Sequence, residues 1–441
     1  MAQASAQTIE RPSDRRDNPR SASDYTAGPA LLRPVTQSSS VDVSEIAHLR
    51  GVELRQALVA RAARLVPLLE TNAAETETDR RVVEENIEAV RAAGLFKLLV
   101  PRRFGGLETD IRTQMEVSRE LARGCGATSW VTTLMNICSW FVGLAPDRLQ
   151  QDVWGENPEA RIAGVFAPSA RSRRVDGGFV VTGKWAWASG SLHADWAFVG
   201  LPIVDEAGDE VDQGFAVIPM AEVTIEDTWF VVGMKGSGSN TIVADEVFIP
   251  DHRIMSVPPL IRGEPPTPYK EETLYQSAFI PVAALALMGP QLGLCAKAFE
   301  FVIDKAPKRA IAYTFYKTQT ESPSFQLAIA QAATLADTAH LFAYRAADAI
   351  DATAKAGEKQ TYLERTRVRM DTGTAIKAAR DAVDVLISAH GAGSFAEVSP
   401  MQRIWRDLET AGRHAVLSPS IAAELYGRAL LGIEEGVTAL V

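Results

Sequence analysis

The sequence predicts an α+β protein with an N-terminal helical domain, a central antiparallel β domain and a C-terminal helical bundle. Three changes of pattern along the 441 residues predict this order. Apolar residues first recur at helical spacing, short β-branched and aromatic runs follow, and long alanine-rich segments complete the chain. We therefore expect domains over residues 45–155, 156–255 and 274–441, with a linker or lid over 256–273.

The N-terminal helical domain follows a polar segment. Residues 1–44 are rich in Ala, Ser, Arg, Pro and Asp and lack the apolar stretch of a secretory signal, so we expect a disordered tail. From Glu45 onward, leucines at 54, 58, 65 and 69 share one helical face. A second helix is expected over 81–93, ended by Gly94, and helical periodicity returns from 112 to about 144.

The central domain is predicted from strand patterns over residues 160–255. Short runs such as WAFVGLPIV and TIVADEVFIP are separated by turn residues, and Asp176-Gly177-Gly178 is typical of a hairpin turn. Five or more strands without intervening helices indicate an antiparallel barrel or sandwich. The next segment, LIRGEPPTPYKEE, contains three prolines, which suits a linker or lid.

The C-terminal bundle is predicted from three helical segments. The first covers residues 325–356 and is terminated by Gly357, the second covers 364–390, and the third covers 413–431. Alanine-rich helices of this length are stabilised mainly by packing against each other, so a bundle is expected.

Composition and missing motifs exclude several classes of protein. Lys and Arg total 45 against 55 Asp and Glu, a net charge of −10, which argues against nucleic acid as a partner. No apolar run approaches the length that spans a bilayer, so no membrane partner is expected. The chain has three cysteines and no CxxC pair, which indicates a reducing compartment. We therefore expect a cytoplasmic protein. Zinc-binding, P-loop, GxSxG and Rossmann motifs are absent.

Four segments carry a resemblance to a known fold: residues 94–108, 181–200, 233–250 and 390–414. Together with the helical–β–helical order, they resemble the acyl-CoA dehydrogenase fold over about residues 75–441. The motifs GATSW, WASG, MKGSGS, RAIAYT and IWRDLETAGRHA are more closely similar to the oxygenase components of two-component flavin-dependent monooxygenases, such as the 4-hydroxyphenylacetate 3-hydroxylases and the steroid-phenol hydroxylases.

This resemblance implies a reaction and its participants. A separate NAD(P)H-dependent reductase supplies diffusible reduced FMN or FAD, O2 is the co-substrate, and one oxygen atom passes through a flavin C4a-hydroperoxide to a small organic substrate. Such an intermediate must be kept from water, so a dry pocket is required. The family also implies a homotetramer whose flavin site spans two subunits.

The resemblance further implies site residues. Ser189 is expected to meet flavin N5, and His414 to exchange a proton near the reacting oxygen. The expected flavin-binding residues are Ser189, Trp187, Arg309, Lys235, Ser237, Ser239, Gly391 and Ser394. The expected substrate pocket consists of Cys138, Trp130, Trp140, Ile280 and Gly164, and Trp185 is a further candidate for its wall. No metal site is expected.

Three pocket positions depart from the phenol-hydroxylating members of the family. Cys138 stands where they have a histidine, Ile280 where the hydroxyphenylacetate enzyme has an arginine, and Gly164 near a pocket serine. A buried phenolate needs paired charge, so these changes favour a neutral aromatic, heteroaromatic or polycyclic substrate, or a sulfur or amine nucleophile.

Other chemistries remain open from the sequence. One alternative is an acyl-CoA dehydrogenase-like FAD enzyme with a displaced base, because the expected glutamate falls at Ala415 and Glu409 would lie on another helical face. A flavin-dependent amine N-hydroxylase, an enzyme oxidising an amine or nitro compound, and a catalytically inactive scaffold are others.

Overall fold

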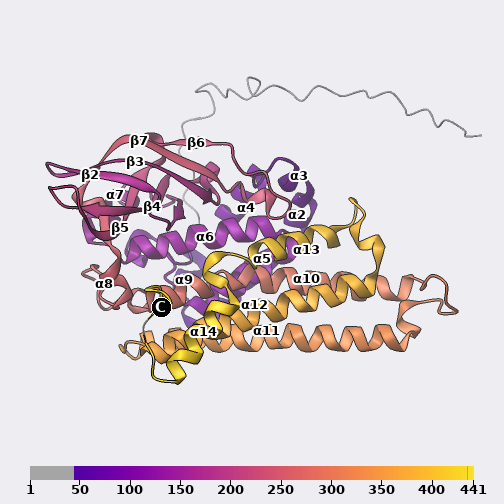
Figure 1. Cartoon of the computed structure of the whole chain (residues 1–441). Helices are drawn as coiled ribbons and strands as arrows, with labels where there is room; N and C mark the ends of the chain where they lie inside the picture. The colour runs from indigo at the N-terminus through magenta and orange to yellow at the C-terminus, as the bar shows by residue number, and fades with distance from the viewer. Residues whose placement is uncertain (1–43, 435) are drawn as a thin grey trace, which may run out of the picture. The chain divides into compact units, whose positions relative to one another are not determined.

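A computed structural model describes residues 44–434 and 436–441, and Figure 1 shows the arrangement of its elements. The predicted tail lies almost wholly outside the described residues. The N-terminal helices are α1 (Ser44–Ala47), α2 (Gly51–Thr71), α3 (Ala73–Thr78), α4 (Glu84–Ala92), α5 (Ile111–Gly124), α6 (Gly126–Gly143) and α7 (Asp147–Trp154).

The N-terminal helices follow the predicted pattern with one exception. Leu54, Leu58 and Leu69 of α2 are buried, and Gly94 has the positive φ of +75° expected after α4. The segment from 112 to 144, predicted as continuous helix, is two helices. Cys125 takes an extended conformation between them and redirects the chain.

The strands form two four-stranded sheets, ordered β1-β4-β5-β8 and β2-β3-β7-β6. They are β1 (Ile162–Val165), β2 (Ala170–Val175), β3 (Gly178–Ala188), β4 (Trp196–Val204), β5 (Glu210–Pro219), β6 (Thr224–Glu226), β7 (Asn240–Pro250) and β8 (Ile254–Ser256). The predicted antiparallel arrangement is wrong for one pair, because β1 runs parallel to β4. The hairpin at Gly177 is present between β2 and β3.

Successive side chains of β4 and β5 point to opposite faces of their sheet and belong to two separate hydrophobic cores. Ala197 and Val199 pack with residues of the second sheet, whereas Phe198 packs with the helical core, as expected when successive side chains point to opposite faces. The β domain is therefore a sandwich of two sheets, and the sheet containing β4 faces α6 and α9.

The remaining helices are α8 (Val257–Ile261), α9 (Phe279–Leu285), α10 (Met288–Lys305), α11 (Pro323–Lys355), α12 (Tyr362–His390), α13 (Pro400–Ala411) and α14 (Pro419–Leu430). In Figure 1, α10, α11 and α12 lie side by side as a bundle. Helices α11 and α12 match the first two predicted segments. The third prediction, a helix over 413–431, is wrong at its start: α13 ends before it, and Pro419 begins α14.

One segment is apolar enough to be mistaken for a membrane span. Within residues 279–308, which contain α9 and α10, the most apolar stretch has a mean hydropathy of 1.7, and 94% of that stretch is buried. The expectation that no apolar run approaches this length is therefore wrong. Its burial identifies it as a core helix pair.

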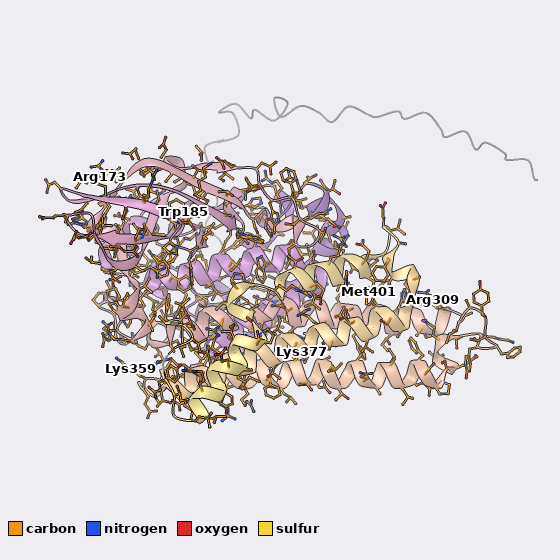
Figure 2. The ribbon with its side chains drawn as sticks, in the orientation of Figure 1. Arg173, Trp185, Arg309, Lys359, Lys377 and Met401 are labelled. Atoms are coloured by element: carbon orange, nitrogen blue, oxygen red, sulfur yellow. The ribbon has the colours of Figure 1, made fainter. Side chains whose placement is uncertain are left out.

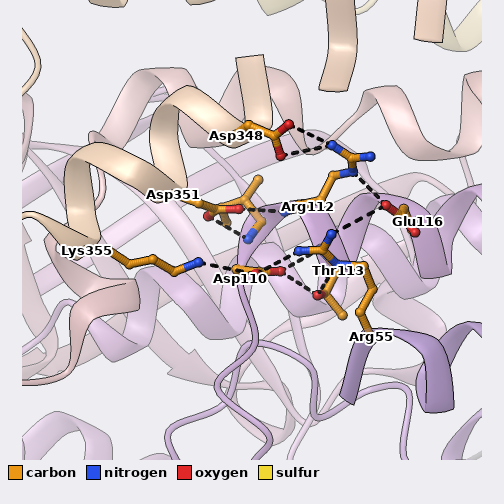
Figure 3. A network of polar contacts seen from close by, with 9 residues as sticks. Arg55, Asp110, Arg112, Thr113, Glu116, Asp348, Asp351 and Lys355 are labelled. Carbon is orange, nitrogen blue, oxygen red and sulfur yellow. Dashed lines mark hydrogen bonds and ion pairs between the residues drawn. The ribbon is translucent and has the colours of Figure 1, made fainter. Parts of the chain in front are cut away.

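A polar network joins the N-terminal helices to α11 (Figure 3). The Asp351 carboxylate accepts hydrogen bonds from the N–H groups of Ile111 (3.0 Å) and Arg112 (3.1 Å) at the start of α5. Burial, with nearby Asp110, raises the pKa of Asp351 to about 6. Arg112 also binds both oxygens of Asp348 at 2.9 Å. These contacts fix α11 against the helix that leads into α6.

Candidate flavin and substrate site

Ser189 lies at the end of β3, against α6. The pairing of β3 with β7 is irregular between Trp185 and Ala188, and Trp187 has a φ of +72°. Gly190 follows with a φ of +74°, and a side chain there would meet Val131 of α6 at 2.8 Å. Only glycine suits both the conformation and the close approach. The turn therefore holds Ser189 next to α6.

Four side chains form a hydrogen-bonded chain around Ser189. Trp130 Nε1 donates to Ser189 Oγ at 3.1 Å. Ser189 Oγ lies 2.6 Å from Ser239 Oγ, which lies 2.6 Å from Ser237 Oγ. Ser237 Oγ donates to the carbonyl oxygen of Met234 at 2.8 Å. The structure thus brings together Trp130, Ser189, Ser237 and Ser239, as the sequence analysis expected of one site.

The loop that carries Ser237 and Ser239 is held by α13. Met234 has a φ of +55°, and its N–H donates to Asp407 Oδ1 at 2.5 Å. Burial raises the pKa of Asp407 to about 6. Lys235, in the same loop, is half-buried. Sequence reasoning did not assign Asp407 to the site, because its partner is 173 residues away in the chain.

His414 follows α13 and lies near Trp130. The centres of the Trp130 and His414 rings are 6.1 Å apart. His414 is an exposed residue, and desolvation by neighbouring protein atoms lowers the pKa of its imidazole to about 4. Ser189 and His414 therefore both border Trp130, and a neutral imidazole stands at that place near pH 7.

Exposed aromatic side chains lie beside the same loop. Trp187 is 66% exposed and meets the Trp229 ring edge-on at 5.0 Å. Trp229 Nε1 donates to the Met234 carbonyl at 2.9 Å. Phe230 is also exposed and lies under the Arg80 guanidinium at 4.1 Å. Trp229 and Phe230 were not predicted as site residues, although an aromatic pair beside a glycine-rich loop is visible in the sequence. The fully buried Trp185 lies inside the sandwich and forms no wall of this site.

Cys138 and Gly164 are in contact. A Cβ on Gly164 would stand 2.6 Å from Cys138 Sγ and 3.1 Å from the Phe198 carbonyl. Cys138 is 3% exposed, and burial raises the pKa of its thiol to about 12. A thiol with that pKa is protonated near neutral pH and is a poor nucleophile.

Phe198, which borders this contact, belongs to a group of packed aromatic rings. They are those of Trp140, Phe141, Phe166, Phe198, Phe215 and Phe279, with neighbouring ring centres 4.6–6.1 Å apart. We call this set the aromatic cluster. Trp140 Nε1 donates to the Leu274 carbonyl, and the buried Ile280 is next to Phe279 in α9. Of the predicted pocket residues, Trp140 belongs to the aromatic cluster, and Cys138 and Gly164 border it at Phe198.

Arg309, Gly391 and Ser394 form a second group. Arg309 Nη1 lies 2.9 Å from His390 Nδ1, which lies 2.7 Å from Ser394 Oγ. Burial, with the charges of Arg309 and Lys305, lowers the pKa of His390 to about 4. Figure 2 shows Arg309 at one end of the C-terminal helices, away from the sheets that contain Trp185. Within one chain, this Arg309 group lies at the end of α13 opposite to His414.

The surface carries two half-open hollows. One of about 280 Å³ is lined by Arg102, Thr109 and Asp351 among others, and one of about 250 Å³ lies beside Cys295 and His340. Neither is lined by a predicted site residue. Among the described residues 44–434 and 436–441, no group of three or more His, Cys, Asp or Glu side chains could hold a metal ion.

Glu409, considered above as a displaced base, is held in ion pairs. Its carboxylate binds Arg380 through two hydrogen bonds of 2.8 Å and also pairs with Arg413. Although burial opposes it, this pairing lowers the pKa of Glu409. A carboxylate so held is a weak base, which disfavours the dehydrogenase alternative.

The fold and these residues match a class of flavoproteins. The family description "Acyl-CoA dehydrogenase, N-terminal domain" matches residues 53–154, and "Acyl-CoA dehydrogenase, C-terminal domain" matches residues 285–419. The chain therefore has the acyl-CoA dehydrogenase fold. The structure of XiaF from Streptomyces sp., in complex with FADH2 and glycerol, superposes with a TM-score of 0.83 at 36% identity and covers 90% of this chain and 98% of that one.

Curated relatives define the family more closely. The chain is 33% identical over 386 residues to HsaA, the oxygenase subunit of a flavin-dependent monooxygenase from Mycobacterium tuberculosis (87% of this chain, 97% of the relative). It is 31% identical over 387 residues to the oxygenase component of an FADH2-dependent resorcinol hydroxylase from Rhizobium sp. (86% and 94%). The chain belongs to the oxygenase components of two-component flavin-dependent monooxygenases. Its activity depends on reduced flavin, and a separate reductase component is implied.

Proposed function

We propose that this chain hydroxylates a neutral, largely apolar aromatic or polycyclic substrate. The contact between Cys138 and Gly164, beside Phe198 of the aromatic cluster, carries this proposal. A phenolate bound there would lie among carbon and sulfur atoms without a paired cation, which is costly. A neutral ring bound between these rings would need no paired charge, and burial of its apolar surface against them is favourable. The FADH2-dependent resorcinol hydroxylase among the relatives supports hydroxylation of an aromatic ring.

The residues around Trp130 suit an isoalloxazine ring. The exposed indole of Trp187 offers an apolar face, and Ser189 offers a hydroxyl oxygen to a polar edge. Bound reduced flavin supplies the electrons that activate O2. Lys235 of the same loop is suited to the phosphate, whereas Ser237 and Ser239 are already bonded to each other.

The Arg309 group suits the phosphate or adenine end of a flavin held by a neighbouring subunit. Arg309 is half-buried. A Cβ added to Gly393 would lie 3.4 Å from the Arg309 guanidinium. Because this group lies far along α13 from His414, one chain's Arg309, Gly391 and Ser394 serve a second chain's flavin in this proposal. A homotetramer is the assembly we propose.

His414 is proposed as the group that exchanges a proton with the reacting oxygen. With its pKa lowered to about 4, the imidazole is neutral near pH 7, and because Nδ1 accepts from the Val416 N–H at 3.4 Å, Nε2 carries the proton that it can donate to the reacting oxygen. Its position beside Trp130, within reach of the same ring that Ser189 borders, supports this role.

The substrate proposal is tested with a panel of paired compounds. Each pair consists of a neutral polycyclic aromatic and the corresponding phenol, offered with reduced flavin and O2, and hydroxylated product is measured per flavin oxidised. We expect product from the neutral member and mainly H2O2 from the phenol. Cys138→His should shift turnover towards the phenol, whereas Cys295→His, at a buried cysteine of α10, should not. Equal turnover of phenols by the unaltered chain would refute the proposal.

A further inference from the structure

We propose that Ser189 is held as a hydrogen-bond acceptor by a one-way chain of hydroxyl groups, and that this chain makes the site select reduced over oxidised flavin. Ser239 and Ser237 are then positioning residues that act through Ser189. This inference rests on the proposed placement of the flavin N5 edge at Ser189.

Both ends of the chain have a fixed direction. The indole Nε1–H of Trp130 can only donate, so Ser189 Oγ is the acceptor in their 3.1 Å bond. A carbonyl oxygen can only accept, so Ser237 donates its proton to Met234 in their 2.8 Å bond. The two bonds between the serines, each 2.6 Å, are not fixed by their own geometry.

The two end bonds nevertheless determine the direction of the two bonds between the serines, because each hydroxyl has one proton. Ser237 has used its proton on Met234, so Ser239 must donate to Ser237. Ser239 has then used its own proton, so Ser189 must donate to Ser239. Every hydroxyl in the chain donates once, and Ser189 has no proton left for a ligand. It retains one lone pair, because Trp130 occupies only the other.

Burial and anchoring keep this direction. Ser189, Ser237 and Ser239 are buried, which leaves little room for water to reorient them. The terminal carbonyl belongs to Met234, whose N–H is bound by Asp407 and whose oxygen also accepts from Trp229 Nε1. Reversing the chain would turn the proton of Ser237 from the Met234 carbonyl to Ser239 and leave the proton of Ser189 without an acceptor in the protein, which is unfavourable in a buried place.

The redox state of the flavin decides whether it matches Ser189. Reduced flavin has an N5–H, a donor that fits the free lone pair of Ser189. Oxidised flavin has a lone pair at N5, which would face the lone pair of Ser189. To bind it, Ser189 must turn its proton away from Ser239 and give up a buried hydrogen bond. One such bond changes an equilibrium by about tenfold.

The test measures the dissociation constants of oxidised and of reduced FMN and FAD, the latter under anaerobic conditions, for the full chain and its variants. The readout is their ratio within each variant, so general weakening of binding cancels. In Ser239→Ala the proton of Ser189 loses its acceptor and becomes available to N5 of oxidised flavin. We expect the preference for reduced flavin to fall about tenfold. Ser237→Ala should change the ratio in the same direction by less.

A matched control separates this effect from the loss of any buried hydroxyl. Ser139 lies on α6 and donates to the Met135 carbonyl at 3.0 Å, outside the chain, so Ser139→Ala should leave the ratio unchanged. An unchanged ratio in Ser239→Ala overturns the inference. Ser189→Ala tests the flavin placement itself: if it alters neither dissociation constant, the placement fails. If it alters them while Ser239→Ala does not change the ratio, only the hydroxyl chain is refuted.

Discussion

Helix α6 presents two regions of opposite character eight residues apart. At Trp130 it meets the hydroxyl chain, where each polar atom has a defined partner. At Cys138 it meets the aromatic cluster, where carbon and sulfur atoms lie in close contact and no charge is paired. A reaction shared by a family needs fixed polar geometry, whereas the choice of substrate depends on shape and desolvation. In the function we propose, chemistry and selectivity are therefore assigned to separate parts of one helix.

The largest effect is expected from His414→Ala, in the polar region around Trp130. Loss of a group that exchanges protons should lower the hydroxylation rate about 100-fold. Because the pKa of His414 is lowered to about 4, the rate of the unaltered chain should show no inflection from this residue between about pH 5 and 8. Rapid-mixing measurements of product formation check both points. His340→Ala, in α11, is the control, and an equal loss in that variant would contradict the assignment.

A second variant tests the apolar region at Cys138 and the aromatic cluster. Gly164→Val places side-chain atoms against Cys138 Sγ and the Phe198 carbonyl, so we expect a loss of about 1–3 kcal/mol in the free energy of unfolding. Urea denaturation measures it. In a double-mutant cycle, Gly164→Ala should cost less when combined with Cys138→Ala. Strict additivity would mean that the two residues do not share one space.

Asp407 provides a pH test of the polar side. Its pKa is raised in the folded chain from 3.8 to about 6, so between these values the folded state binds more protons than the unfolded state. The free energy of unfolding therefore contains a component that falls as pH rises from about 4 to 6. Asp407→Asn should remove this component and weaken binding of reduced flavin.

Asp351 is the matched control for this prediction. Its pKa is also raised to about 6, and its carboxylate also accepts from backbone N–H groups, but it lies at α11. Asp351→Asn should remove the pH-dependent component of the unfolding free energy that Asp351 contributes. It should not change flavin affinity. If both variants alter flavin binding equally, the anchoring of Met234 by Asp407 has no special role.

The smallest effect is expected from Trp130→Phe. This change removes one donor to Ser189 and should reduce affinity for reduced flavin by less than tenfold, at a cost of about 1 kcal/mol in stability. Trp140→Phe removes a comparable bond to the Leu274 carbonyl and should cost similar stability without changing flavin affinity. Isothermal titration with reduced FMN, under anaerobic conditions, distinguishes the two.

Local patterns predicted most of the fold. Gly94, the turn at Gly177 and the alanine-rich helices α11 and α12 each depend on residues near them in the chain. The break at Cys125 and the separate helix α13 were missed, because tertiary contacts decide them. The parallel pairing of β1 with β4 likewise has no local signature.

The site was predictable only in part, for the same reason. Ser189, Ser237, Ser239 and Trp130 lie together, as the motif resemblance suggested. The contact of Asp407 with Met234 and that of Arg309 with His390 join residues far apart in the sequence. Periodicity carries no information on such pairs. Whether the Arg309 group completes a second chain's site stays a prediction.

The close approach of Gly164 to Cys138 limits how this protein could acquire a new specificity. A side chain at 164 collides with the thiol, and a larger residue at 138 must occupy the space above the glycine. A side chain at 164 is the harder change to accommodate, because the Cys138 thiol and the Phe198 carbonyl both stand in its way. Mutational paths that change specificity here should therefore alter residue 138 while 164 remains glycine, and laboratory evolution should find substitutions at 138 first.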